Sequence, residues 1–246
     1  MDITQSTVFY DSQEVKSRDA AVQYCKTHES SHRYLAYRDI PAIVQKYSCS
    51  GKALDYGTGT GCSAKFLYSI GFEVVAVDTS LEMLTQAKLQ YPDFFFDQVQ
   101  DGVVPLDSES VDLVFSSFVL FEIGNENDII SYLQEAKRLL KRNGIFIAVT
   151  GSQNLHSPFR DWLSFNCQFQ VNNNLSSGDL AKLYLYDADM EFTDYYWSEL
   201  DYRKFFALAG VELLEIIYPL GKESDPYNWK DEKKVSPFVI LVGKSK

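Results

Sequence analysis

The sequence predicts an α/β fold built on a mostly parallel sheet, with helices on both faces and an additional helical segment at the N-terminus. From Gly51 onward, short runs of β-forming residues alternate with amphipathic stretches of helix length, which is the pattern of strand–helix–strand units. The chain has 246 residues, a length at which an α/β chain often forms one domain. Hydrophobic residues make up 46% and charged residues 23% of it, a globular composition that excludes disorder, collagen-like repeats and coiled coil.

The expected elements follow one another along the chain. Residues 11–47 contain few glycines and repeat apolar residues at helical spacing, which predicts helices. The β-forming runs that follow are Ala53–Tyr56, Glu73–Val77, Phe94–Phe96, Val111–Phe115 and Ile145–Val149. Stretches with helical periodicity lie between these runs. One is expected to begin after Ser80 as its N-cap, and a later one is expected to end at Asn143-Gly144 in a left-handed backbone conformation.

The pattern loosens after Thr150. No clear period is visible over residues 151–196, which indicates an insert. Order returns at Ser198 with a capping-box-like helix start, followed by the strand-like runs Val211–Tyr218 and Phe238–Val242.

Charge and cysteine usage narrow the function classes. Asp and Glu total 34 against 23 Lys and Arg, a formal net charge of −11, which disfavours nucleic acid as a partner because such a chain repels phosphate backbones. The four cysteines form no CxxC pair, so neither a redox motif nor a metal site is expected. No secretory signal and no bilayer-spanning run is visible, so we expect a soluble, cytoplasmic protein with no membrane partner. The sequence does not predict an oligomeric state.

A glycine-rich loop is the sharpest motif. Gly57, Gly59 and Gly61 alternate with Thr58 and Thr60 between a predicted strand and a predicted helix. Glycines at such a junction let the backbone turn tightly and approach a ligand closely, although they can also serve packing alone. A dinucleotide-binding fingerprint would place its third glycine at position 62, where this chain has a cysteine.

Two carboxylates complete the motif. Asp55 lies where the first strand opens into the loop, and a negative charge there would repel a pyrophosphate but pair with an ammonium group. Asp78 ends the next strand, where an acid accepts both hydroxyls of a ribose or simply caps the strand end. Together these features fit S-adenosylmethionine better than a dinucleotide.

At these residues the sequence resembles the class I S-adenosylmethionine-dependent methyltransferases, of the methyltransferase-domain types 11 and 25, in their small-molecule branch. The likeness covers residues 33–150 and extends more loosely beyond them. Val111–Ser116 looks like the family's fourth strand, and Leu139–Gly144 looks like its Leu-Leu-Lys-Pro-Gly-Gly turn with the proline and the first glycine replaced. The resemblance implies a Rossmann-like sheet of seven strands whose last, Phe238–Val242, is antiparallel to the rest.

The resemblance also implies a division of the single domain, residues 1–246, and a set of cofactor contacts. The parts are a helical lid (1–50), a cofactor-binding core (51–150), an insert or cap (151–196) and a C-terminal helix with strands (197–246). The residues expected to bind the cofactor are Asp55, Gly57, Thr58, Gly59, Gly61, Asp78, Thr79, Met83, Asp101, Gly102, Ser116 and Arg33. Of these, Met83 is also a natural core residue, Asp101 can be a plain loop acid, and Arg33, expected at the methionine carboxylate, can be a surface arginine.

Catalytic and acceptor-binding residues are less marked in the sequence. His156, just past the fifth strand, and His32, in the lid, are candidate general bases, because a neutral imidazole accepts a proton near neutral pH. Most loop histidines are merely solvated. The residues expected to line an acceptor pocket are Tyr10, Tyr24, Glu122, Tyr195, Tyr196 and Trp197. Aromatic residues also pack as core, and this alternative stays open.

We therefore expect an S-adenosylmethionine-dependent methyltransferase that acts on a small molecule by in-line displacement, a reaction in which positioning supplies most of the barrier reduction. The alternatives are a methyltransferase for protein or RNA and a catalytically silent module that binds the cofactor and regulates a partner. A nucleotide-dependent oxidoreductase is a third, which Asp55 and Cys62 disfavour. Whether the acceptor atom is oxygen, nitrogen or carbon stays open.

Overall fold

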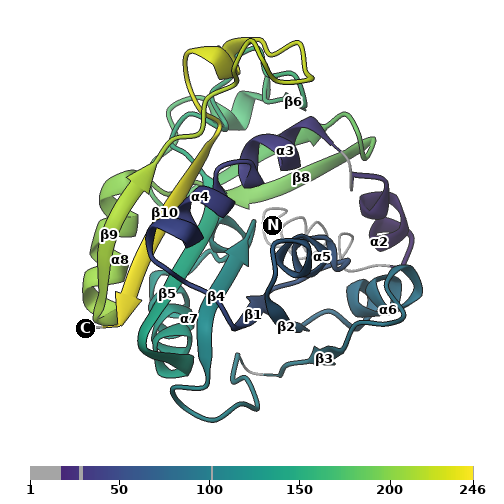
Figure 1. Ribbon diagram of the computed structural model, residues 1–246. Coiled ribbons are helices and arrows are strands. Elements are labelled where there is room, and N and C mark those ends of the chain that lie inside the picture. The colour runs from purple at the N-terminus through teal and green to yellow at the C-terminus, as the bar shows by residue number, and fades with distance from the viewer. Residues whose placement is uncertain (1–17, 28–29, 101, 246) are drawn as a thin grey trace, which may run out of the picture.

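A seven-stranded sheet forms the centre of the molecule (Figure 1). The computed structural model describes residues 18–27, 30–100 and 102–245. In spatial order the strands are β3 (Phe96–Gln98), β2 (Glu73–Asp78), β1 (Lys52–Tyr56), β4 (Val111–Ser117), β5 (Leu140–Gly151), β10 (Phe238–Ser245) and β9 (Val211–Ile217). The first five pair in parallel, and β10 is antiparallel to both of its neighbours. The expected Rossmann-like sheet with an antiparallel last strand is confirmed.

Both faces of the sheet are covered by helices because successive strand residues point to opposite sides. In β4, Leu113 and Phe115 pack in one core cluster and Val114 packs in the other. Helices α4 (Ile40–Lys46) and α5 (Cys62–Ser69) cover the first face. The second face is covered by α7 (Glu126–Leu139) and α8 (Glu199–Ala209), which also pack on one another.

Helix starts that the sequence marks are formed as expected. Helix α6 (Leu81–Gln90) begins after Ser80, whose hydroxyl accepts a hydrogen bond from the backbone N–H of Met83 at 3.3 Å. Helix α8 begins with a complete capping box between Ser198 and Asp201. Within the described residues, no helix combines the length and apolarity that a membrane span requires.

The carboxyl edge of the sheet is covered by two separate parts of the chain (Figure 1). One is N-terminal and holds α2 (Arg18–Tyr24), a short 3-10 helix η1 (Cys25–Thr27) and α3 (Ser31–Tyr37). The other is a three-stranded antiparallel sheet of β6 (Phe165–Asn166), β7 (Leu180–Leu185) and β8 (Met190–Tyr195). Two more 3-10 helices, η2 (Leu120–Glu122) and η3 (Gln170–Asn172), flank this region, and η4 (Asp231–Lys233) precedes β10.

The structure corrects several expected boundaries. Helix α7 ends at Leu139 and strand β5 begins at once, so Asn143-Gly144 lies within the strand and is no left-handed stop. The cause is an irregularity in the β4–β5 pairing, where the register shifts between Val111 and Leu113 and the extra residues of β5 are absorbed. Strand β3 begins at Phe96, where the sequence led us to expect its end.

Candidate functional site

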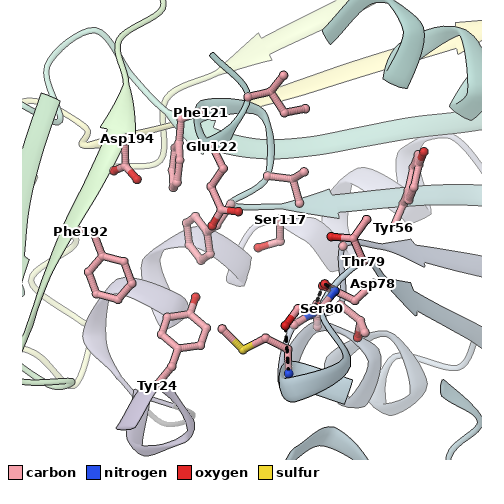
Figure 2. A pocket seen from close by; sticks show the side chains of 18 of the residues that line it. Tyr24, Tyr56, Asp78, Thr79, Ser80, Ser117, Phe121, Glu122, Phe192 and Asp194 are labelled. Carbon is pink, nitrogen blue, oxygen red and sulfur yellow. Dashed lines mark hydrogen bonds between the residues drawn. The ribbon is translucent and has the colours of Figure 1, made fainter. Parts of the chain in front are cut away.

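A cavity of about 490 Å³ opens at the carboxyl edge of the sheet, between the strand ends and the small antiparallel sheet. Carboxyl edges of parallel strands are where open α/β sheets bind ligands. Figure 2 shows Asp194 and Phe192 across the cavity from Asp78, Thr79 and Ser80. The residues expected from the sequence that line it are Tyr24, His32, Arg33, Gly57, Thr58, Gly59, Asp78, Thr79, Met83, Gly102, Glu122 and Tyr195.

The three glycines of the loop have different surroundings. All have positive φ, which is +87° at Gly57, +53° at Gly59 and +85° at Gly61. A Cβ on Gly57 would stand 2.4 Å from a methyl group of Val119. A Cβ on Gly61 would stand 2.9 Å from the ring of Tyr91, so this glycine serves packing and lies off the cavity wall. A Cβ on Gly59 would meet no atom within 4 Å, because it would project into the open cavity.

The carboxylate of Asp78 holds this loop in place. Its Oδ2 accepts a hydrogen bond from the backbone N–H of Gly59 at 2.7 Å. Its Oδ1 accepts one from the backbone N–H of Ser80 at 2.8 Å, and Figure 2 shows these two residues side by side. Asp78 also lines the cavity. Each carboxylate oxygen can accept more than one hydrogen bond, which is the property that recognition of a ligand's hydroxyl groups requires.

Asp55 lies beneath the loop instead of on the cavity wall. It is fully buried and accepts a hydrogen bond from the hydroxyl of Ser63, at the start of α5, at 2.7 Å. Burial raises the pKa of Asp55 to about 7, against the opposing effect of the neighbouring Thr58 and Ser63 hydroxyls. Its contacts are therefore to the turn itself, so it does not reach into the cavity as a free ion-pair partner.

Arg33 places a buried cation on the cavity wall. Its side chain is held by Thr27, whose carbonyl accepts from Nε at 3.1 Å and whose hydroxyl accepts from Nη2 at 3.1 Å. The guanidinium stands 4.9 Å from the ring centroid of Tyr24 and 5.9 Å from that of Phe118. In the described part of the chain no carboxylate forms an ion pair with it. A positive charge on an apolar wall is a natural partner for a ligand carboxylate.

The two candidate histidines are placed differently. His32 lines the cavity, packs its ring 5.6 Å from that of Phe165 and is almost fully buried. Burial lowers the pKa of His32 to about 4, so its imidazole is neutral at pH 7 and accepts protons weakly. His156 lies behind the wall, where its Nε2 is 3.1 Å from Oδ2 of Asp194.

Four other expected site residues lie off the cavity, and two lie outside the described residues. Ser116 is buried and accepts a hydrogen bond from the hydroxyl of Tyr132 at 2.9 Å, while its neighbour Ser117 lines the cavity. Trp197 packs edge-on to Phe205 in the core. Gly61 packs as described above, and Tyr196 is also absent from the wall. Tyr10 and Asp101 fall outside the described residues, so their predicted roles stay predictions.

Several residues of the cavity wall were not predicted from the sequence. The part of the wall distant from Asp78 is mostly apolar and comes from η2, β6, β7, β8, the start of β10 and neighbouring turns. Its aromatic and aliphatic members are Phe118, Phe121, Ile123, Leu155, Phe165, Leu180, Leu183, Leu185, Phe192 and Phe238. One readable signal exists in β7, where the buried Ala181, Leu183 and Leu185 alternate with the half-buried Lys182 and Tyr184. Asp194 has none, because its partner His156 is 38 residues away.

The donor set fits a nucleoside that carries a charged amino-acid tail. Asp78 faces the cavity from the strand end, the open face of Gly59 allows close approach of a ligand, and Arg33 offers a cation. Within residues 18–27, 30–100 and 102–245, no group of three or more His, Cys, Asp or Glu side chains is arranged to hold a metal ion.

Comparison with known proteins agrees with this geometry. Residues 54–148 match a family model described as a methyltransferase domain. The chain is 30% identical over 184 residues to a demethylmenaquinone methyltransferase of Renibacterium salmoninarum, covering 70% of this chain and 76% of that one. It is 28% identical over 160 residues to a malonyl-[acyl-carrier protein] O-methyltransferase of Enterobacter lignolyticus, covering 64% and 62%.

Solved structures share the fold. An S-adenosylmethionine-dependent methyltransferase from Clostridium acetobutylicum superposes with a TM-score of 0.61 at 18% identity, over 86% of this chain and 91% of that one. Another from Mesorhizobium loti superposes with a TM-score of 0.61 at 15% identity, over 88% and 99%. The sheet order, the glycine turn followed by Asp78, and these relatives lead to one conclusion: the chain belongs to the class I S-adenosylmethionine-dependent methyltransferases.

Proposed function

We propose that this enzyme transfers a methyl group from S-adenosylmethionine to a small molecule with an apolar body, and that both bind in the cavity described above. One observation carries the proposal. A single cavity joins the glycine turn and Asp78 to the apolar wall supplied by the insert, and its volume of about 490 Å³ lies within the range of small-molecule sites.

In the part of the cavity near Asp78, each of the residues predicted to bind the cofactor can be assigned a contact with it. Asp78 accepts the ribose hydroxyls, and the backbone at Gly57, Thr58 and Gly59 lies along the cofactor. Arg33 pairs with the methionine carboxylate, which supplies the negative charge that the guanidinium lacks among its described partners. When bound, S-adenosylmethionine supplies a methyl group carried by a positively charged sulfonium, whose sulfur becomes a neutral thioether once the methyl group has been transferred.

The adenine lies in this assignment beside Thr79, Met83 and Gly102. These residues line the cavity on the Asp78 side. The carbonyl of Gly102 accepts a hydrogen bond from the hydroxyl of Tyr56 at 2.6 Å, and the Tyr56 ring stacks on that of Tyr132 with centroids 4.1 Å apart. This stack supports the loop after β3. Asp55 and Gly61 do not line the cavity, and in this assignment they contribute to cofactor binding by maintaining the conformation of the glycine turn.

The acceptor half is the apolar wall. Its residues exclude water from the reaction path and hold the acceptor in line with the methyl group, which is where most of the rate gain of such a displacement arises. Two relatives are named for demethylmenaquinone and for malonyl-[acyl-carrier protein] as their acceptors. The net charge of −11 disfavours RNA as the acceptor.

Calorimetric binding tests the cofactor assignment. S-adenosylmethionine, its demethylated product and NAD are titrated into the wild type, Asp78→Ala and the control Asp93→Ala, which removes an exposed carboxylate in the turn before β3. We expect the wild type and the control to bind the first two and not NAD. Asp78→Ala loses at least about tenfold in affinity, since charge-assisted hydrogen bonds contribute about 1.5–3 kcal/mol. Binding of NAD alone would contradict the proposal.

A further inference from the structure

Asp194 presents a buried carboxylate to the cavity. It lies on β8, and its side chain is only 5% exposed while still lining the cavity. Its Oδ2 is 3.1 Å from Nε2 of His156, whose side chain is 3% exposed. A carboxylate only accepts hydrogen bonds, so Nε2 carries the proton and donates it. Within the described residues no group donates to Oδ1 of Asp194.

The surroundings of this carboxylate are aromatic, with one more acid. Phe121 and Phe192 line the same part of the cavity, and Glu122 contributes a second carboxylate from η2 (Figure 2). Aromatic faces attract cations. The Asp194 side chain is largely buried but reaches the cavity wall, so a ligand that donates a hydrogen bond to Oδ1 from the cavity would stabilise the carboxylate.

We propose that the methyl acceptor is a small amine with an apolar body, and that Asp194, oriented by His156, binds its nitrogen and accepts its proton. The inference rests on the proposed function. The amine enters as a cation, its N–H groups donate to Oδ1 of Asp194, and its apolar body packs on the aromatic wall. Glu122 raises the negative potential of the cavity and favours the same charge.

Competing head groups fit less well. A carboxylate acceptor would face both Asp194 and Glu122, and like charges that share a mostly apolar cavity repel one another. An alcohol can donate one hydrogen bond to Oδ1, but it brings no charge to balance the buried carboxylate.

The proton has a defined path. An ammonium has no free electron pair, so its nitrogen cannot accept a methyl group until it loses a proton. One N–H proton moves to Asp194, which leaves a neutral amine with a lone pair and a neutral carboxyl group that still accepts from His156. In this arrangement Asp194 is the catalytic residue and His156 is a positioning residue, because His156 does not line the cavity.

Matched probes test the charge preference. The wild type, saturated with S-adenosylhomocysteine, is titrated with amine, alcohol and carboxylate versions of phenylethyl, indolylethyl and hexyl bodies. We expect an amine to bind at least about tenfold more tightly than its matched alcohol, which corresponds to about 1.4 kcal/mol, and the carboxylates to bind most weakly. Equal affinity for amine and alcohol, tighter binding of a carboxylate, or no binding of any amine overturns the inference.

Variants test the residues. Asp194→Asn keeps the side-chain shape, and Glu191→Gln is the matched control, because Glu191 lies on the same strand with a side chain 56% exposed. We expect Asp194→Asn to abolish the amine preference and Glu191→Gln to keep it. His156→Gln lowers the ratio of amine to alcohol affinity, whereas a purely structural role would weaken both probes equally. Retention of the full preference in Asp194→Asn overturns the assignment.

Failure of this inference differs from failure of the proposed function. A wild type that binds no S-adenosylhomocysteine overturns the function itself. A wild type that binds S-adenosylhomocysteine but shows no amine preference overturns only the acceptor class. If Asp194→Asn does not fold, as judged by its thermal unfolding and S-adenosylhomocysteine binding, the wild-type probe series still decides the acceptor class.

Discussion

The carboxylate of Asp78 accepts a hydrogen bond from the backbone N–H of Gly59 at 2.7 Å. This contact ties the end of β2 to the glycine turn that follows β1. The side chain that we propose for the ribose therefore also fixes the loop along which we propose that the cofactor lies. The site is thus organised before a ligand binds, which reduces the ordering cost of binding. Mutation of Asp78 is therefore expected to remove both the proposed ribose contact and the hydrogen bond that holds the glycine turn in place.

Two glycine substitutions in this turn should have different effects. Gly57→Ala places a Cβ 2.4 Å from Val119 at a φ of +87°, so we expect the free energy of unfolding to fall by about 2 kcal/mol or more. Gly59→Ala meets no protein atom at a φ of +53° and should cost about 1 kcal/mol, yet its methyl group obstructs the cavity. Urea denaturation and calorimetry should find Gly59→Ala folded and at least about tenfold weaker for S-adenosylmethionine. Full affinity in Gly59→Ala would argue that no ligand approaches this backbone.

The role of Arg33 can be separated from that of the adenosine contacts. S-adenosylhomocysteine carries the amino-acid tail, and 5′-methylthioadenosine lacks it. We expect Arg33→Met to weaken S-adenosylhomocysteine at least about tenfold, since a buried charge-assisted pair is lost. The affinity for 5′-methylthioadenosine should stay the same in calorimetric titrations. Equal weakening of both ligands would show that Arg33 acts through the shape of the site.

Asp55 should make the protein less stable as pH rises. Its folded pKa of about 7 lies above the ordinary value of 3.8, so between pH 4 and pH 7 the folded state binds more protons than the unfolded state. Stability contributed by the protonated group is present at about pH 4 and is lost progressively toward pH 7, by up to about 4 kcal/mol. Denaturation of the wild type and Asp55→Asn at several pH values measures this, and the slope assigned to Asp55 should disappear in the variant.

His32 should act in the opposite direction over part of the same range. Burial lowers its pKa to about 4 from 6.5, so the unfolded state takes up the proton first as pH falls. Stability contributed by the neutral group is present above about pH 6.5 and is lost toward pH 4, by up to about 3 kcal/mol. We expect His32→Gln to remove this acid sensitivity in the same denaturation series. If the free energy of unfolding of the variant still falls below pH 6.5 as it does in the wild type, groups other than His32 cause the acid sensitivity.

The parts of the fold that the sequence predicts are those with strong local signals. Strand β1 is a short β-forming run that leads into the glycine turn, and the turn itself needs residues that tolerate positive φ. Ser80 and Ser198 mark helix starts because a side-chain oxygen there replaces a missing backbone acceptor. Each signal lies within a few residues, so no knowledge of the tertiary structure is needed.

The remaining features depend on contacts between distant segments. The end of α7 is set by the irregular pairing of β5 with β4, which overrides the helical period that continues past Leu139. The antiparallel sheet over β6–β8 consists of short strands whose inward residues are mixed in type. Asp194 faces the cavity only because β8 pairs with β7 in one register and His156 lies behind it.

The place of β10 in the sheet has a consequence for synthesis. This strand pairs on one side with β5 and on the other with β9, and residues 238–243 are buried. Until Phe238–Ser245 has left the ribosome, both neighbouring strands present an open edge, and exposed edges of this kind are templates for pairing between chains. We therefore expect the incomplete chain to be prone to aggregation until β10 inserts between β5 and β9.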